Sequence, residues 1–149
     1  MKAIAIGSDP NAAGLKTAVM GLLEGMGRPC QDYGSDDTVY ANVAIRVAEA
    51  VAAGTHDRGI LICGTGIGMS IAANKVPGAY AALVADAYSA ERARKSNNAN
   101  IVTLGAFTTG VELAKVLVRI WLQAEYTPGG PSEPKVRRIV AYEERRDGG

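Results

Sequence analysis

The sequence contains few residues of the kinds that mark secreted, metal-binding or nucleic-acid-binding proteins. Among 149 residues there are two cysteines, one histidine, one tryptophan and one phenylalanine, and the formal net charge is +1. A charge so close to zero excludes a surface that coats nucleic acid. Apolar residues make up 48% of the chain and charged residues 21%, which excludes a disordered protein. The expected partner is a small molecule or another copy of the chain, with no nucleic acid.

Long apolar runs are also missing. Gly, Lys or Asp interrupts every apolar stretch well before the roughly 20 residues that a membrane span needs. The N-terminus, MKAIAIGSD, has no apolar region of the signal-peptide type. We therefore expect a cytoplasmic protein without a membrane partner. In that reducing environment Cys30 and Cys63 are each predicted to be free thiols.

Short apolar strands that alternate with amphipathic helices predict an α/β fold of one domain, residues 1–149. Strands are expected at residues 2–7, 29–33, 59–63, 79–84 and 101–104, with a helix after each. The second helix is expected to be capped by Asp36 or Thr38 and closed by Gly54. Such alternation implies right-handed crossovers and helices on both faces. The predicted fold is a Rossmann-like three-layer sandwich with a five-stranded parallel sheet and a C-terminal tail helix.

The tail differs in composition from the rest of the chain. The segment EYTPGGPSEP is rich in Pro and Gly and predicts a linker, and residues 135–146 form a charged, helical stretch. A tail with so little apolar surface cannot build a core of its own. We therefore expect residues 131–149 to dock on another surface.

Polar or reactive residues follow three of the predicted strands. They are Ser8 and Asp9 after the first strand, residues 63–68 after the third, and Asp86 after the fourth. In open α/β sheets ligands bind beyond the carboxyl ends of the strands, so these positions are candidate site residues. Asp9 is equally suited to cap the helix that begins near Asn11, and both roles can hold together.

The third strand leads into the loop Gly64-Thr65-Gly66-Ile67-Gly68. Its backbone amides can approach an anion or oxyanion without obstruction from side chains. A dinucleotide fingerprint would need glycine where Met69 stands, so nucleotide binding is not favoured. Cys63 precedes the loop, where nearby amides would favour a thiolate base, although a small buried hydrophobe is the alternative. His56 lies in a polar turn and is expected to be solvated and without function.

The segment GILICGTGIGMSIAANKVPG resembles the signature of the ribose-5-phosphate isomerase B / galactose-6-phosphate isomerase family. The resemblance extends from AIGSD through DAYSAERARKSNNANIVTLGA to the tail near Ile139. It implies a cofactor-independent aldose-ketose isomerase that acts on a phosphorylated sugar through an enediolate and uses no metal. It also implies a homodimer or homotetramer with shared active sites, in which the tail docks on a neighbouring subunit.

The resemblance assigns roles to individual residues. Cys63 matches the branch of the family that uses a cysteine base, whereas a second branch has glutamate at the position of Met69. The resemblance also implies that Thr65 assists at the reacting oxygens and that the backbone amides of Gly64, Gly66 and Gly68 bind the enediolate oxygen. It implies that Asp9, Tyr40 and Asn97 contact the substrate. Lys135 would anchor the phosphate group, with Arg137 or Arg138 as substitutes.

Departures from the family pattern bear on the substrate. Pro10 and Ser96 stand where the family has histidines, the second of which opens the sugar ring, and Phe107 and Pro131 replace arginines. A tetrose 4-phosphate cannot close a furanose ring, because its ring-closing oxygen is blocked, and needs no ring-opening acid. VYAN and SNNAN also resemble the tetrose-phosphate (D-erythrulose-4-phosphate) isomerase branch. The alternatives are a ribose-5-phosphate or hexose-6-phosphate isomerase, and a non-catalytic sugar-phosphate-binding subunit.

Overall fold

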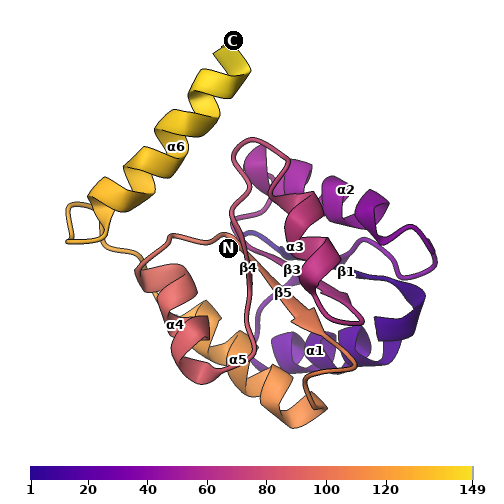
Figure 1. Cartoon of the computed structure of the whole chain (residues 1–149). Helices are drawn as coiled ribbons and strands as arrows, with labels where there is room; N and C mark the ends of the chain where they lie inside the picture. Colours follow the sequence, from indigo (N-terminus) through magenta and orange to yellow (C-terminus); the bar gives the residue numbers. More distant parts are fainter. Residues whose placement is uncertain (149) are drawn as a thin grey trace.

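The computed structural model describes residues 1–148 and has a five-stranded sheet at its centre (Figure 1). All neighbouring strands are parallel, in the order β2-β1-β3-β5-β4. The strands are β1 (Ile4–Ser8), β2 (Cys30–Asp32), β3 (Gly59–Cys63), β4 (Ala81–Leu83) and β5 (Ile101–Gly105). The helices are the short 3-10 turn η1 (Pro10–Ala12), α1 (Ala13–Gly25), α2 (Tyr40–Ala52), α3 (Ile67–Ala73), α4 (Ala87–Lys95), α5 (Val111–Gln123) and α6 (Glu133–Gly148).

Helices cover both faces of the sheet, as the alternating pattern predicts (Figure 1). Successive residues of a strand point to opposite faces. Ile60 and Ile62 of β3 therefore pack in the core beneath α1, α4 and α5, whereas Leu61 packs beneath α2 and α3. The whole of β3 is buried, which explains why its sequence is apolar without alternation. The predicted three-layer α/β sandwich is confirmed.

The order of the strands was not predicted from the sequence, and the expected cap of α2 is wrong. The fifth strand, β5, lies between β3 and β4, so β4 is a short edge strand of three residues. The start of α2 is stabilised by Asp37, whose carboxylate accepts from Val39 N at 2.8 Å and from Asn42 Nδ2 at 3.0 Å. The expected caps, Asp36 and Thr38, are wrong, because α2 begins at Tyr40 and its N-cap is Val39, which offers no capping side chain. Gly54 closes the helix as predicted, with φ at +82°.

The tail helix α6 stands away from the sandwich for much of its length (Figure 1). Its Glu143 contacts the body of the same chain, because Oε2 accepts from Tyr80 OH at 2.7 Å and from Gly78 N at 3.1 Å. Ile139 and Tyr142 of α6 are each 53% exposed. Docking of the tail on a neighbouring subunit stays a prediction, and these exposed side chains are available for it.

The isolated histidine is placed differently from the expectation. His56 is only 3% exposed, and its ring nitrogens lie 2.8 Å from Tyr33 OH and 2.7 Å from the Ala3 carbonyl oxygen. The prediction that it is solvated is wrong, because the turn that carries it folds against the start of β1. Both cysteines are free thiols, as predicted. Over residues 1–148 no helix combines the length and apolar character of a membrane span.

Candidate active site

Cys63 is the last residue of β3, and its side chain faces the layer of α2 and α3. The residue is 5% exposed, and its Sγ lies 3.1 Å from the backbone nitrogen of Gly66, which donates to it. A donor of this kind interacts more strongly with a thiolate than with a neutral thiol. Cys63 is thus both a small buried residue and a sulfur held against the amides of the loop.

The glycine loop is held firmly against β5. The hydroxyl of Thr103 donates to the carbonyl oxygen of Gly66 at 2.8 Å, and Phe107 N donates to the carbonyl oxygen of Gly64 at 2.9 Å. Gly66 has φ at +81°, and a Cβ there would lie 3.0 Å from the backbone of Leu104. Only glycine fits this position without strain. Thr103 was missed by the sequence analysis, although a hydroxyl inside the apolar run IVTLG is a signal that it needs a partner.

Two aromatic rings flank the loop. A Cβ on Gly68 would collide with the ring of Tyr40, and a Cβ on Gly64 would lie 2.9 Å from the ring of Phe107. Tyr40 is 40% exposed and Phe107 is 72% exposed, so both rings border solvent beside the loop. Thr65 lies between these glycines, and its Oγ1 accepts from Ile67 N at 3.2 Å. Gly64, Thr65 and Gly68 therefore lie together with Tyr40, as predicted.

Asp9 joins this group because β1 is the neighbour of β3. Its backbone N–H donates to the Ile62 carbonyl oxygen at 3.1 Å, and its Oδ1 accepts from Ala12 N at 3.1 Å. It caps the short helix η1 and leaves its second carboxylate oxygen without a protein donor among the described residues. The two roles predicted for Asp9 are therefore compatible.

Asp86 makes no hydrogen bond to this group among the described residues. β4, which precedes it, is separated from β3 by β5. Its Oδ2 accepts from Ser89 N at 2.8 Å, and hydrogen bonds from Ser89 lower the pKa of the Asp86 carboxyl. Asp86 is the N-cap of α4, and we assign it no other role.

Two predicted site residues are not brought to Cys63 within one chain. Asn97 lies between α4 and the start of β5, at the amino edge of the sheet, and its Nδ2 donates to the Arg92 carbonyl oxygen at 3.1 Å. Lys135 is exposed on the tail helix α6. Because all strands are parallel, the amino and carboxyl edges are opposite, so Asn97 and Cys63 lie at different ends of the fold.

The positions that depart from the family pattern have local structural roles. Ser96 Oγ accepts from Arg92 Nε at 2.7 Å at the end of α4. Pro10 is the first residue of η1, directly after the capping Asp9. The one histidine of the chain, His56, is bound at the amino end of β1. None of these residues places an imidazole beside the glycine loop.

No cluster of metal-binding residues is found in the described part of the chain, where no three His, Cys, Asp or Glu side chains converge. The polar groups around the glycine loop are backbone amides, the hydroxyls of Thr65 and Tyr40, and the carboxylate of Asp9. Amides of this kind stabilise a developing oxyanion. The arrangement therefore suits proton transfer beside a carbonyl group.

The chain is similar to characterised proteins over nearly its whole length. Residues 4–139 match the family model described as Ribose/Galactose Isomerase. D-erythrulose-4-phosphate isomerase of Pectobacterium atrosepticum is 50% identical over 147 residues, which cover 96% of each chain. Ribose-5-phosphate isomerase B of Escherichia coli is 43% identical over 99% of this chain and 100% of its own.

Among solved structures, ribose-5-phosphate isomerase B of Clostridium thermocellum has the same fold. It superposes with a TM-score of 0.91, covers 98% of this chain and 99% of its own, and is 42% identical. Sequence and fold thus agree over the strands, the glycine loop and most of the tail. The chain belongs to the Ribose/Galactose Isomerase family, a family of sugar-phosphate isomerases.

Proposed function

We propose that the protein is a cofactor-independent aldose-ketose isomerase in which Cys63 is the base and a tetrose 4-phosphate is the substrate. The observation that carries the proposal is the contact between Cys63 Sγ and the Gly66 amide at 3.1 Å. This contact supports the proposal because the sulfur lies beside loop amides that can hold an oxyanion. This is the combination that isomerisation through an enediolate requires.

The reaction moves two protons and leaves every carbon-oxygen bond in place. The Cys63 thiolate removes the proton from the carbon beside the aldehyde, and the electron pair moves to the carbonyl oxygen to give the enediolate. Amides of Gly64, Gly66 and Gly68 stabilise that oxygen, and Thr65 assists the transfer of the hydroxyl proton between the two oxygens. Cys63 then returns its proton to the former aldehyde carbon, which gives the ketose.

The substrate assignment depends on the absence of a ring-opening histidine. Ser96 is bound to Arg92, and Pro10 has no acid-base group, so a cyclic pentose phosphate would wait for spontaneous ring opening. An open-chain tetrose phosphate would not. The 50% identity to a protein named D-erythrulose-4-phosphate isomerase supports this substrate, while the 43% identity to a ribose-5-phosphate isomerase keeps ribose 5-phosphate as the second candidate.

We also propose that a neighbouring copy of the chain supplies Asn97 and Lys135. A strand of five residues separates the two edges of the sheet by about 16 Å. Within one chain Asn97 therefore cannot reach a small substrate held at Cys63. Apolar side chains surround the loop and are exposed, as expected for a surface covered by a second copy; they are Val39, Ile67, Ile71, Leu83 and Phe107.

Isomerisation in D2O tests the mechanism. A proton that passes through the exchangeable Cys63 thiol should leave deuterium on the carbon beside the ketose carbonyl. A hydride shift between the two carbons needs no base and would leave that carbon without deuterium, which would contradict the proposal. Absence of turnover with four-, five- and six-carbon sugar phosphates alike would instead favour a non-catalytic sugar-phosphate-binding subunit.

A further inference from the structure

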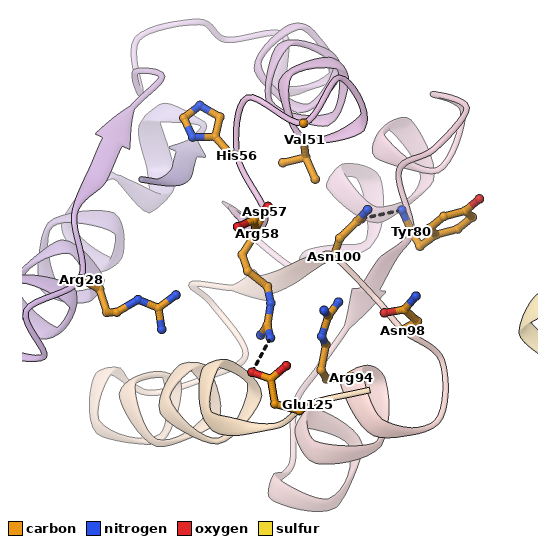
Figure 2. Close-up of a pocket in the computed structure, with 11 residues that line it drawn as sticks. Arg28, Val51, His56, Asp57, Arg58, Tyr80, Arg94, Asn98, Asn100 and Glu125 are labelled. Carbon is orange, nitrogen blue, oxygen red and sulfur yellow. Dashed lines mark hydrogen bonds and ion pairs between the residues drawn. The ribbon is translucent and has the colours of Figure 1, made fainter. Parts of the chain in front are cut away.

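A second polar cavity lies at the amino edge of the sheet, opposite the glycine loop. Its volume is about 470 Å³, and its lining includes Arg28, Arg58, Arg94, Asn98 and Asn100. Figure 2 shows that the side chains of Arg28, Arg58 and Arg94 point toward one another from different parts of the fold. Arg28 lies between α1 and β2, Arg58 immediately precedes β3, and Arg94 lies in the last turn of α4.

Arg58 is the fixed element of this cavity. It is 6% exposed, and its guanidinium donates to the carbonyl oxygens of Trp121 at 2.8 Å and Ala124 at 3.1 Å. Burial, together with the positive charges of Arg94 and Arg28, lowers the pKa of Arg58 to about 10, against the opposing effect of Glu125. Arg58 therefore remains charged at neutral pH, where the guanidinium groups repel one another.

The carboxylates at the cavity compensate these charges only in part. Glu125 lies 3.7 Å from Arg58 Nη2, but its side chain is 76% exposed. Asp57, the other acidic residue of the lining, pairs with Lys2 at 3.5 Å and has a side chain 71% exposed. Ion pairs with such exposed carboxylates are weak. The cavity thus keeps an excess of positive charge.

Two guanidinium donors of arginines that line the cavity lack an acceptor. The Nε atoms of Arg28 and Arg94 are buried and have no hydrogen-bond partner among the described residues. Arg94 reaches the Ala99 carbonyl oxygen through Nη1 at 3.3 Å, so its side chain is held in place while Nε stays unpaired. A buried unpaired donor of this kind is destabilising by roughly 1–3 kcal/mol. An anion in the cavity would bind the accessible parts of these guanidinium groups and relieve the repulsion among them.

We propose that this cavity is a second anion site, which binds the phosphate group of a small phosphorylated metabolite. Guanidinium forks match phosphate oxygens in pairs, which favours phosphate over a simple halide. The volume exceeds that of a bare phosphate and lies in the range of small-molecule pockets. The amides of Asn98 and Asn100 at the rim can bind hydroxyl groups of the attached sugar or alditol.

Titration of the full-length protein with inorganic phosphate, followed by backbone amide NMR, tests this site. At constant ionic strength the amides of Arg58, Asn98 and Asn100 should shift to saturation in the wild-type protein. Arg28→Gln should weaken this binding about tenfold or more, because it removes a charge-assisted donor pair. Arg119→Gln is the matched control, since it removes the same charge from an exposed position of α5 outside the cavity, and its titration should equal that of the wild type.

A second probe, an alditol phosphate, has no carbonyl group and cannot be isomerised. Tighter binding than inorganic phosphate would identify a phosphorylated metabolite as the ligand, and equal affinity would identify free phosphate. Retention of the shifts in Lys135→Ala would show that the site is separate from the proposed substrate anchor. Shifts confined to residues 64–68, shifts reproduced by chloride, or an unchanged affinity in Arg28→Gln would each overturn the proposal.

Discussion

The sulfur of Cys63 and the backbone N–H of Gly66 face each other at 3.1 Å across the turn that joins β3 to α3. The turn closes tightly because Gly66 adopts φ of +81° and its carbonyl oxygen accepts from the Thr103 hydroxyl. The strand end thus places the proposed base and an oxyanion donor in one short segment. Local backbone geometry, rather than a long side chain, positions the reactive atom.

Cys63→Ser should abolish turnover while the fold and the oligomer remain intact. Serine preserves the size of the side chain but is too weak an acid to supply an anionic base at neutral pH. Cys30→Ser is the matched control, because it removes the other free cysteine, and its kcat should equal that of the wild type. The measurements are kcat and the circular dichroism spectrum. Full activity in Cys63→Ser would exclude cysteine-base catalysis.

Gly68→Ala should lower kcat/KM by displacing Tyr40. A Cβ at position 68 would collide with the tyrosine ring, which must then move away from the loop. Gly21→Ala in α1 is the control, since its Cβ would meet nothing within 4 Å. That change should stabilise the protein by about 0.5–1 kcal/mol with kcat/KM unchanged. Normal kinetics in Gly68→Ala would mean that the position of Tyr40 does not matter to catalysis.

Two inactive variants should restore activity when they are mixed. If Cys63 of one chain works with Asn97 of a neighbour, a hetero-oligomer of Cys63→Ala and Asn97→Ala contains some intact sites. Random exchange of subunits into dimers should recover about a quarter of the wild-type rate. The experiment measures the isomerase activity of the mixture after subunit exchange and compares it with the activity of each variant alone. A mixture that stays inactive although exchange has occurred would rule out shared sites.

Asp32→Asn should destabilise the fold without touching the active site. Lys16 is 5% exposed, and its Nζ lies 2.8 Å and 2.9 Å from the two carboxylate oxygens of Asp32. Removing the carboxylate leaves a buried ammonium with a weaker partner, which should lower the free energy of unfolding by roughly 2–3 kcal/mol. Asp36→Asn, at an exposed position, is the control and should have little effect.

The same ion pair predicts a pH dependence. Burial raises the pKa of Asp32. The hydrogen bonds from Lys16 and Gly34 and the charge of Lys16 lower this pKa by a larger amount, so the net shift is downward. A carboxyl whose folded pKa is lowered adds stability above its unfolded value, about 4, and this stability is lost as the pH falls through the folded pKa. Denaturant unfolding should therefore show a smaller loss of stability at acid pH in Asp32→Asn than in the wild type.

The strands and the glycine loop could be predicted from the sequence because their signals are local. An apolar run such as GILIC followed by glycines identifies a buried strand and a turn without further knowledge. The position of β5 between β3 and β4 could not be predicted, because strand order depends on how crossovers pack. The cap of α2 was predicted wrongly because Asp36 and Thr38 are residues that favour an N-cap, whereas the helix begins later, after Val39.

The cationic cavity had no signal in the sequence. Arg28, Arg58 and Arg94 are far apart along the chain, and each alone is an ordinary surface charge until the fold brings their guanidinium groups together. His56 was misjudged for the same reason, because its partners Tyr33 and Ala3 belong to other segments. Asn97 and Lys135 were assigned by resemblance, and one chain does not bring them to Cys63.

The ratio of kcat/KM for a tetrose 4-phosphate to kcat/KM for ribose 5-phosphate distinguishes the two candidate substrates. We predict a ratio above one, because the tetrose is already open and no histidine stands at position 96 to open the pentose ring. Ser96→His should raise kcat/KM for ribose 5-phosphate by up to about a hundredfold and leave the tetrose value unchanged or lower. A wild-type enzyme that prefers ribose 5-phosphate would contradict the assignment of a tetrose 4-phosphate as the substrate, since another residue would then have to open the ring.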